Sequence, residues 1–284
     1  MSTVSKVLAG VLLASALVVT PGARAQASSS GVNDWSCQPS AAHPHAVVLL
    51  HGLGAPAYDH WSYHASYLAG RGWCVFYPTY GQGSPLFLNG GLRPIAESAE
   101  EVADYVDDVL AATGTAEVDL VGHSEGGFLS LYIPKMLNFG AKVHRAFAMA
   151  SPTHGTSYAG VFGLADGLGI RATVNLLVTL FGCGACNDMV TGGPAVMDLN
   201  DGPVTVPGVE YTILASRFDV LVTPTETAFV YEPGVTNRYV QDTCPLDPVG
   251  HVGLAFDSGV GQMIANALDP AHATPVTCGI GPPV

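Results

Sequence analysis

Short apolar runs alternate with amphipathic segments along most of the chain. Residues 46–50, AVVLL, form a continuous apolar run, which is typical of a strand buried on both faces of a parallel sheet. Further strands are predicted at residues 73–77, 118–121, 143–150, 211–215 and 238–241. Because no repeat or linker interrupts this alternation, the sequence predicts one α/β domain over residues 36–284, with a mostly parallel central sheet flanked by helices.

The clearest helical pattern lies at residues 94–110. Pro94 suits the first turn of a helix, and Ile95, Val102 and Val106 recur on one face while acidic residues cover the other. Shorter helices are predicted at residues 60–69, 128–138 and 253–268.

Residues 158–196 do not follow this alternation of apolar strands and amphipathic helices. They are apolar and rich in glycine, without a clear period. Two interpretations stay open: a lid or acyl-binding wall inserted after a core strand, or an ordinary buried pair of helices.

The N-terminus has the pattern of a secretory signal peptide over residues 1–25. Lys6 precedes an apolar run at residues 7–19, and the small residues Ala25 and Ala27 offer cleavage sites. The alternative, a membrane anchor, is disfavoured because the run is short for a bilayer. Residues 26–35 then form a lead-in, and the mature protein is expected outside the cell without stable membrane insertion.

The net charge of the chain limits the kinds of partner that it is expected to bind. The formal net charge is −13, and removal of the leader, which holds two cations and no acid, makes it −15. An acidic surface repels nucleic acid and anionic lipid heads, so neutral substrates are expected. No cofactor is expected, because neither a set of metal ligands nor a phosphate-binding glycine loop occurs. We expect a monomer.

Six cysteines lie in the predicted mature part. An even count in an exported chain predicts three disulfides, for which 15 pairings exist. The expected pairs each bracket a local unit: Cys37 with Cys74, Cys183 with Cys186, and Cys244 with Cys278. The alternative for CGAC, a redox or metal motif, lacks a second CxxC and a preceding strand.

Ser124 is the candidate nucleophile. It lies in GHSEG, residues 122–126, directly after a predicted strand and before a predicted helix. A sharp strand-to-helix turn exposes a serine hydroxyl and needs small residues two positions before and after it, here Gly122 and Gly126.

Two backbone N–H groups are candidate donors to an oxyanion. The first belongs to Glu125, next to the nucleophile at the start of a helix. The second is assigned to Leu53, in the HGLG loop after the strand at residues 46–50. His51, in the same loop, is expected to shape the loop rather than to act as a base.

His251 is the candidate base. It lies in a loop between the last predicted strand and the last predicted helix, where an imidazole can reach the nucleophile. The rivals fit less well, since His144 falls within a strand, His154 precedes the candidate acids and His272 lies in a proline-flanked tail.

Asp219 is the candidate acid, because it follows the strand at residues 211–215 and can fix the imidazole tautomer. The other aspartates are disfavoured by their positions before that strand, near the cystine and the histidine loop, or on the final helix: Asp198, Asp201, Asp242, Asp247 and Asp257.

With these residues in place, the chain resembles the secreted actinobacterial-type lipases and esterases of the α/β-hydrolase superfamily, often called class 2 lipases. The matching runs are LLHG at 49–52, GHSEGG at 122–127, SPTHGT at 151–156 and CPLD at 244–247. The resemblance covers nearly the whole predicted mature chain. It implies an α/β-hydrolase fold with three disulfides and a triad of Ser124, Asp219 and His251.

The resemblance also implies hydrolysis of acylglycerols or simpler carboxylic esters through an acyl-enzyme, with a lipid–water interface as one setting. One departure is Glu125, where many such lipases carry Gln or Met. Two other functions stay open: an extracellular acyltransferase on the same fold, and a catalytically inactive binding or adhesion protein.

Overall fold

A single parallel sheet organises the part of the chain that the computed structural model describes, residues 31–83, 89–158, 160–180 and 182–284. Within this part six strands pair in the order β2-β1-β3-β4-β5-β6, every pair parallel. The strands are β1 (Ala46–Leu50), β2 (Val75–Phe76), β3 (Val118–His123), β4 (Val143–Met149), β5 (Glu210–Ala215) and β6 (Thr236–Tyr239). The predicted mostly parallel sheet is therefore confirmed, although β2 is shorter than expected and β6 begins and ends two residues earlier.

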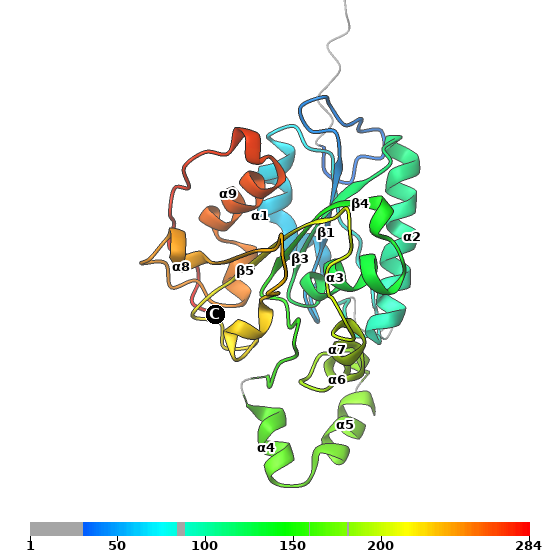
Figure 1. The fold of residues 1–284 in the computed structure, drawn as a ribbon, viewed down its shortest axis with the longest axis vertical. Helices are drawn as coiled ribbons and strands as arrows, with labels where there is room; N and C mark the ends of the chain where they lie inside the picture. Colours follow the sequence, from blue (N-terminus) through cyan, green and yellow to red (C-terminus); the bar gives the residue numbers. More distant parts are fainter. Residues whose placement is uncertain (1–30, 84–88, 159, 181) are drawn as a thin grey trace, which may run out of the picture.

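Helices cover both faces of the sheet (Figure 1). On one face pack α1 (Ala57–Ala69) and α9 (Ser258–Leu268), and on the other α2 (Ile95–Thr113) and α3 (Glu125–Met136). Strand β1 serves both layers, because Val47 and Leu49 contact the α1 side while Val48 and Leu50 contact the α2 side. This is why its five residues are all apolar and all buried.

Local signals explain where the helices differ from the predicted ranges. Helix α2 continues to Thr113, where Gly114 ends it in a left-handed conformation. The closing helix was predicted over residues 253–268, but this range is wrong: a short 3-10 helix η3 (Val252–Ala255) comes first, and the Asp257 side chain caps α9 by accepting from the Val260 N–H.

The described residues between 158 and 196 form a helical region at one end of the molecule. Its helices are α4 (Val161–Gly167), α5 (Arg171–Leu180), α6 (Gly184–Asp188) and α7 (Pro194–Leu199). Helices α4 and α5 project away from the sheet (Figure 1), and α5 has no buried residue among those described. Helix α4 does bury Phe162 and Ala165, so the interpretation as an ordinary buried helix pair is wrong for α5. The exposed apolar side chains of the two helices include Leu164, Leu168, Leu176, Leu177 and Leu180.

The expected disulfide pairing is confirmed. Bridges join Cys37 to Cys74, Cys183 to Cys186 and Cys244 to Cys278, with Cα atoms 5.8, 5.4 and 5.4 Å apart.

The predicted signal peptide and its cleavage sites lie outside the described residues. In the described part of the chain, no helix combines the length and apolar character needed to cross a bilayer.

Candidate active site

Ser124 occupies a sharp turn between β3 and α3. Its φ is +56°, a backbone conformation that costs free energy for a residue with a side chain. The flanking glycines are required by contact: a Cβ on Gly122 would overlap the Gly126 carbonyl, and one on Gly126 would overlap the Leu50 carbonyl. The Ser124 N–H donates to the Met149 carbonyl at 2.8 Å, which ties the turn to β4. The turn expected from GHSEG is present.

The structure brings Ser124, His251 and Asp219 together. The Nε2 atom of His251 lies 2.9 Å from the Oγ of Ser124, and its Nδ1 lies 2.7 Å from the Oδ2 of Asp219. Since an ionised carboxylate only accepts, Nδ1–H donates to Asp219 and Nε2 is left to accept the serine proton. The side chains of His251 and Asp219 are both buried. Such an arrangement can activate a serine oxygen as a nucleophile.

Asp219 is itself held by backbone donors. It follows β5, and its Oδ1 accepts from the N–H groups of Leu221 at 2.8 Å and Val222 at 2.9 Å. These bonds leave Oδ2 facing the imidazole, so the orientation of the carboxylate is fixed from both sides.

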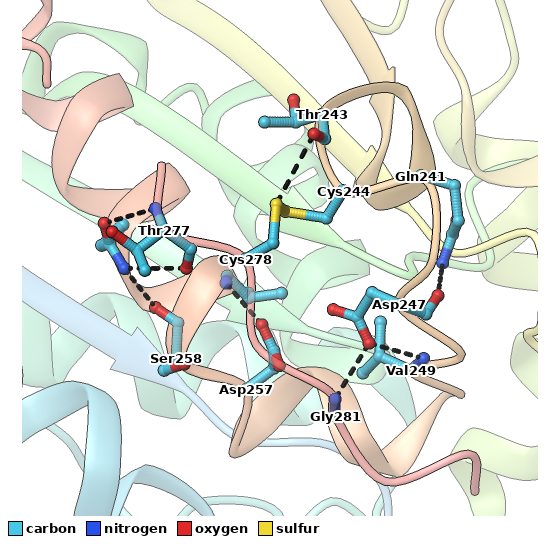
Figure 2. Close-up of a disulfide and its surroundings, with 12 residues drawn as sticks. Gln241, Thr243, Cys244, Asp247, Val249, Asp257, Ser258, Thr277, Cys278 and Gly281 are labelled. Carbon is cyan, nitrogen blue, oxygen red and sulfur yellow. Dashed lines mark hydrogen bonds between the residues drawn. A yellow bond between two sulfur atoms is a disulfide. The ribbon is translucent and has the colours of Figure 1, made fainter. Parts of the chain in front are cut away.

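Three rival acids have other roles in the fold, and Figure 2 shows two of them, Asp247 and Asp257. The Oδ1 of Asp247 accepts from the N–H groups of Val249 at 3.0 Å and Gly281 at 2.9 Å, beside the Cys244–Cys278 disulfide. Asp257 caps α9, as described above. Asp242 forms an ion pair with Arg217 at 2.6 Å. Asp247 and its neighbours thus tie the loop that carries His251 to the C-terminal segment.

The rival histidines are also bonded elsewhere. His144 lies 2.9 Å from Asp119 and His154 bonds the carbonyl of Phe229 at 2.9 Å. His272 lies at the surface beside Asp269.

The two predicted oxyanion donors lie in suitable places. Glu125 opens α3 directly after Ser124, and Leu53 lies between β1 and α1. The N–H of Gly54, the next residue in this loop, already has an acceptor, since it donates to the Gly90 carbonyl at 3.0 Å. Within the described residues, the N–H groups of Leu53 and Glu125 donate to no other protein group. His51 shapes this loop as expected: its Nδ1–H donates to the Gly52 carbonyl at 2.9 Å, and burial lowers its pKa to about 4.

A cleft of about 310 Å³ opens at Ser124 and His251. Its remaining wall is largely apolar and includes Leu53, Pro152, Tyr158, Met189, Leu221 and Val222. A larger cleft of about 490 Å³ lies over β5, β6 and α9, but none of the predicted site residues lines it. Among the described residues no group of three or more His, Cys, Asp or Glu side chains is placed to hold a metal ion.

The Glu125 side chain does not line the cleft, although its backbone does border the nucleophile. The carboxyl group is fully buried, packs against Gly91, and finds no hydrogen-bond partner among the described residues. Burial, reinforced by the Asp188 carboxylate, raises its pKa well above the ordinary range. Burial therefore favours the neutral form of the side chain, which resembles a glutamine rather than adding a charge near the substrate.

The cleft wall includes residues that the sequence pattern did not single out, among them His60, Tyr158 and Met189. His60 carried a weak signal, because it precedes His64 by one helical turn on α1 and the GHSEG motif holds another histidine. Tyr158 and Met189 carried none, since their positions depend on how the helical region 158–196 packs.

Residues 47–257 match the alpha/beta hydrolase family. The chain belongs to that family, in agreement with the fold and with the strand–turn–helix at Ser124.

Similar proteins include a triacylglycerol lipase of Pseudarthrobacter phenanthrenivorans, 36% identical over 99 residues. This match covers 33% of the present chain and only 29% of that lipase. Lipase B of Aspergillus fumigatus shares the fold with a TM-score of 0.60 at 18% identity, over 82% of this chain and 54% of its own. The mature lipase BlEst2 of Bacillus licheniformis has a TM-score of 0.56 at 18% identity, over 84% and 95%.

Glu125→Gln should stabilise the protein at neutral and alkaline pH. The folded pKa is raised, so the unfolded chain releases the proton first, and stability falls as pH rises above the unfolded pKa of about 4.5. At pH 8 we expect a gain of about 1 kcal/mol or more, or roughly 2–4 °C in Tm, that vanishes near pH 4. Thermal unfolding across pH checks this, with the exposed Glu100→Gln as control. A gain that is largest at pH 4 would contradict the neutral carboxyl.

Gly126→Ala should prevent the turn at Ser124 from forming, because the new Cβ meets the main-chain carbonyl of Leu50, which cannot move without breaking β1. We expect a loss of more than about 3 kcal/mol in the free energy of unfolding. Gly163→Ala, on the open side of α4, is the matched control. Denaturant unfolding compares them, and equal stability of the two variants would disprove the steric requirement.

Proposed function

We propose that the chain is a carboxylic-ester hydrolase of the lipase or esterase kind, acting through Ser124, His251 and Asp219. The observation that carries the proposal is the unbroken line of two hydrogen bonds from Asp219 through His251 to the serine oxygen. The related triacylglycerol lipase and the two lipases of the same fold support the choice of reaction.

The reaction proceeds in two stages. Ser124 Oγ attacks the ester carbonyl as His251 Nε2 takes its proton, and the negative oxygen that forms is bound by the N–H groups of Leu53 and Glu125. His251 returns the proton to the leaving alcohol, which leaves an acyl group on Ser124. Water, deprotonated by His251, then attacks the acyl group. The bond between the acyl carbon and the Ser124 oxygen breaks as His251 returns the proton to that oxygen, and the carboxylic acid is released.

The substrate is a neutral ester with an apolar acyl part, such as an acylglycerol. An apolar cleft wall favours acyl chains, and the net charge of −13 disfavours anionic substrates. Helices α4 and α5 serve as a lid or acyl-binding wall: Tyr158 borders the cleft just before them and their leucines face outward. The protein works outside the cell as a monomer, in keeping with the leader pattern and the three disulfides.

Ser124→Ala should abolish ester hydrolysis and leave the fold intact. Removal of the nucleophile from a triad lowers kcat by about 10⁴-fold or more. Hydrolysis of p-nitrophenyl butyrate, labelling by a fluorescent phosphonate and the Tm are measured together. Normal turnover by the variant would refute the proposed function. Product analysis with a competing alcohol separates hydrolysis from acyl transfer, since a transferase would form mainly the new ester.

The lid proposal predicts a split between substrates. Replacing Leu176, Leu177 and Leu180 with Ser should lower activity on an emulsified long-chain triacylglycerol several-fold, because apolar side chains hold the enzyme at an oil surface. Activity on dissolved p-nitrophenyl butyrate should stay within about twofold. Ile280→Ser, at an exposed apolar residue of the C-terminal segment, is the control. Equal losses on both substrates would contradict the lid.

A further inference from the structure

Three buried histidines surround the loop of His251 without entering the proposed reaction. His60 and His64 lie one turn apart on α1, and His123 immediately precedes the nucleophile. His60 also borders the cleft. Each is at most 9% exposed.

Two of them form a chain of hydrogen bonds that ends on the main chain of His251. The Nε2 atom of His123 lies 2.9 Å from the His251 carbonyl oxygen. The Nδ1 atom of His123 lies 3.0 Å from the Nε2 of His60. The three rings follow one another in this order, in tilted contacts with centroids 4.9 Å apart at both steps.

The direction of each hydrogen bond follows from the groups involved. A carbonyl oxygen only accepts, so the Nε2 of His123 must carry a hydrogen and donate it. A neutral imidazole has one N–H, which leaves the Nδ1 of His123 as an acceptor. The donor to that acceptor is then the Nε2–H of His60.

Burial keeps the imidazoles of His60 and His123 in the neutral forms that these hydrogen bonds require. Together with the neighbouring His51, His64 and His251, it lowers the pKa of His60 to about 3. Burial likewise holds the pKa of His123 well below its ordinary range, with His251 and His60 adding to the effect. Both imidazoles are therefore neutral when His251 is active, and each has one defined tautomer.

We propose that His60 is a positioning residue: through His123 it holds the main chain of His251 where the Nε2 of His251 reaches Ser124. This inference deepens the proposed function and rests on it. Without the His60 donor, the Nδ1 of His123 would be buried and unpaired, which favours another tautomer or ring orientation. The His251 carbonyl would then lose its donor, and a displacement of about 1 Å at a base can cost up to roughly 10²-fold in rate.

His64 provides a matched control within the same helix. Its Nε2–H donates to the carbonyl of Leu254 at 2.9 Å, so it is a buried histidine bonded to the same loop. Its acceptor is three residues beyond His251, however, and His64 contacts neither His251 nor Ser124 by any hydrogen bond among the described residues. A purely structural role for α1 histidines would make His60 and His64 equivalent.

The experiment compares His60→Leu, His60→Gln and His64→Leu in the full chain. For His60→Leu we expect kcat on p-nitrophenyl butyrate and the rate of phosphonate inactivation to fall about tenfold, with KM unchanged. His60→Gln should recover most of this loss, because its amide N–H can still donate to His123. His64→Leu should lower the Tm but keep kcat within about twofold. Equal kcat losses in all three variants, or none in His60→Leu, would overturn the proposal.

A double variant separates action through His123 from direct action. In a His123→Gln background, whose amide can donate to His251 without a partner at residue 60, His60→Leu should have little further effect on kcat. Additive losses in this background would overturn the proposal.

Nitrogen NMR of the histidines tests the hydrogen-bond directions independently of activity. His123 and His60 should both be neutral Nε2–H tautomers between pH 5 and 8, limits that follow from the lowered pKa values. An Nδ1–H tautomer of His123 would overturn the inference even where His60→Leu fails to fold. If the unaltered protein hydrolyses no ester, the proposed function fails, whereas the NMR result still decides the hydrogen-bond chain.

Discussion

The strained backbone of Ser124 is the constraint around which the site is built. A non-glycine residue at this φ costs on the order of 1–3 kcal/mol, which surrounding packing has to offset. The offset comes from β3, which lies between the two helical layers, from α3, which packs on one face of the sheet, and from the bond to the Met149 carbonyl. Because Gly122 and Gly126 have no side chains, the main chains of β3, of α3 and of the end of β1 can contact one another at this turn. These contacts fix the position of Ser124 relative to the sheet.

The other site residues depend on loops rather than on regular elements. Asp219 is oriented by two backbone N–H groups of its own turn, and His251 by a loop that α1, β3 and the C-terminal segment all contact. Loops offer the reach that three distant segments need in order to meet, and the bonds to rigid neighbours supply the precision. This combination of flexible loops and rigid neighbours explains how a small sheet brings together Ser124, Asp219 and His251, which are far apart in the chain.

Much of the fold and of the candidate site could be predicted from the sequence, because both follow from hydrophobic periodicity and from the order of residues along the chain. The all-apolar run at residues 46–50 favoured a central strand, and GHSEG between a predicted strand and a predicted helix favoured a sharp turn. Burial of Glu125 was not readable, since a charged residue type gave no sign that its carboxyl would be neutral. His60 was also missed as part of the site, because its partner lies 63 residues away and only the packing of α1 beside β3 brings them together. The exposure of α5 depended on tertiary contacts that its apolar pattern did not reveal.

The Cys244–Cys278 bridge affects one part of the site and not the other, because it restrains the loop of His251 but not the turn at Ser124. The turn at Ser124 needs only β1, β3, β4 and α3, which are complete once residue 149 has folded. The histidine loop is fastened by a segment beyond Cys278, and the bridge that restrains it removes roughly 4 kcal/mol of chain entropy for its 34-residue separation. With Cys244 and Cys278 reduced, the chain would thus keep the turn at Ser124 while the loop of His251 is held more loosely. Oxidation of this one cysteine pair would then fasten His251 beside a serine turn that is already in place.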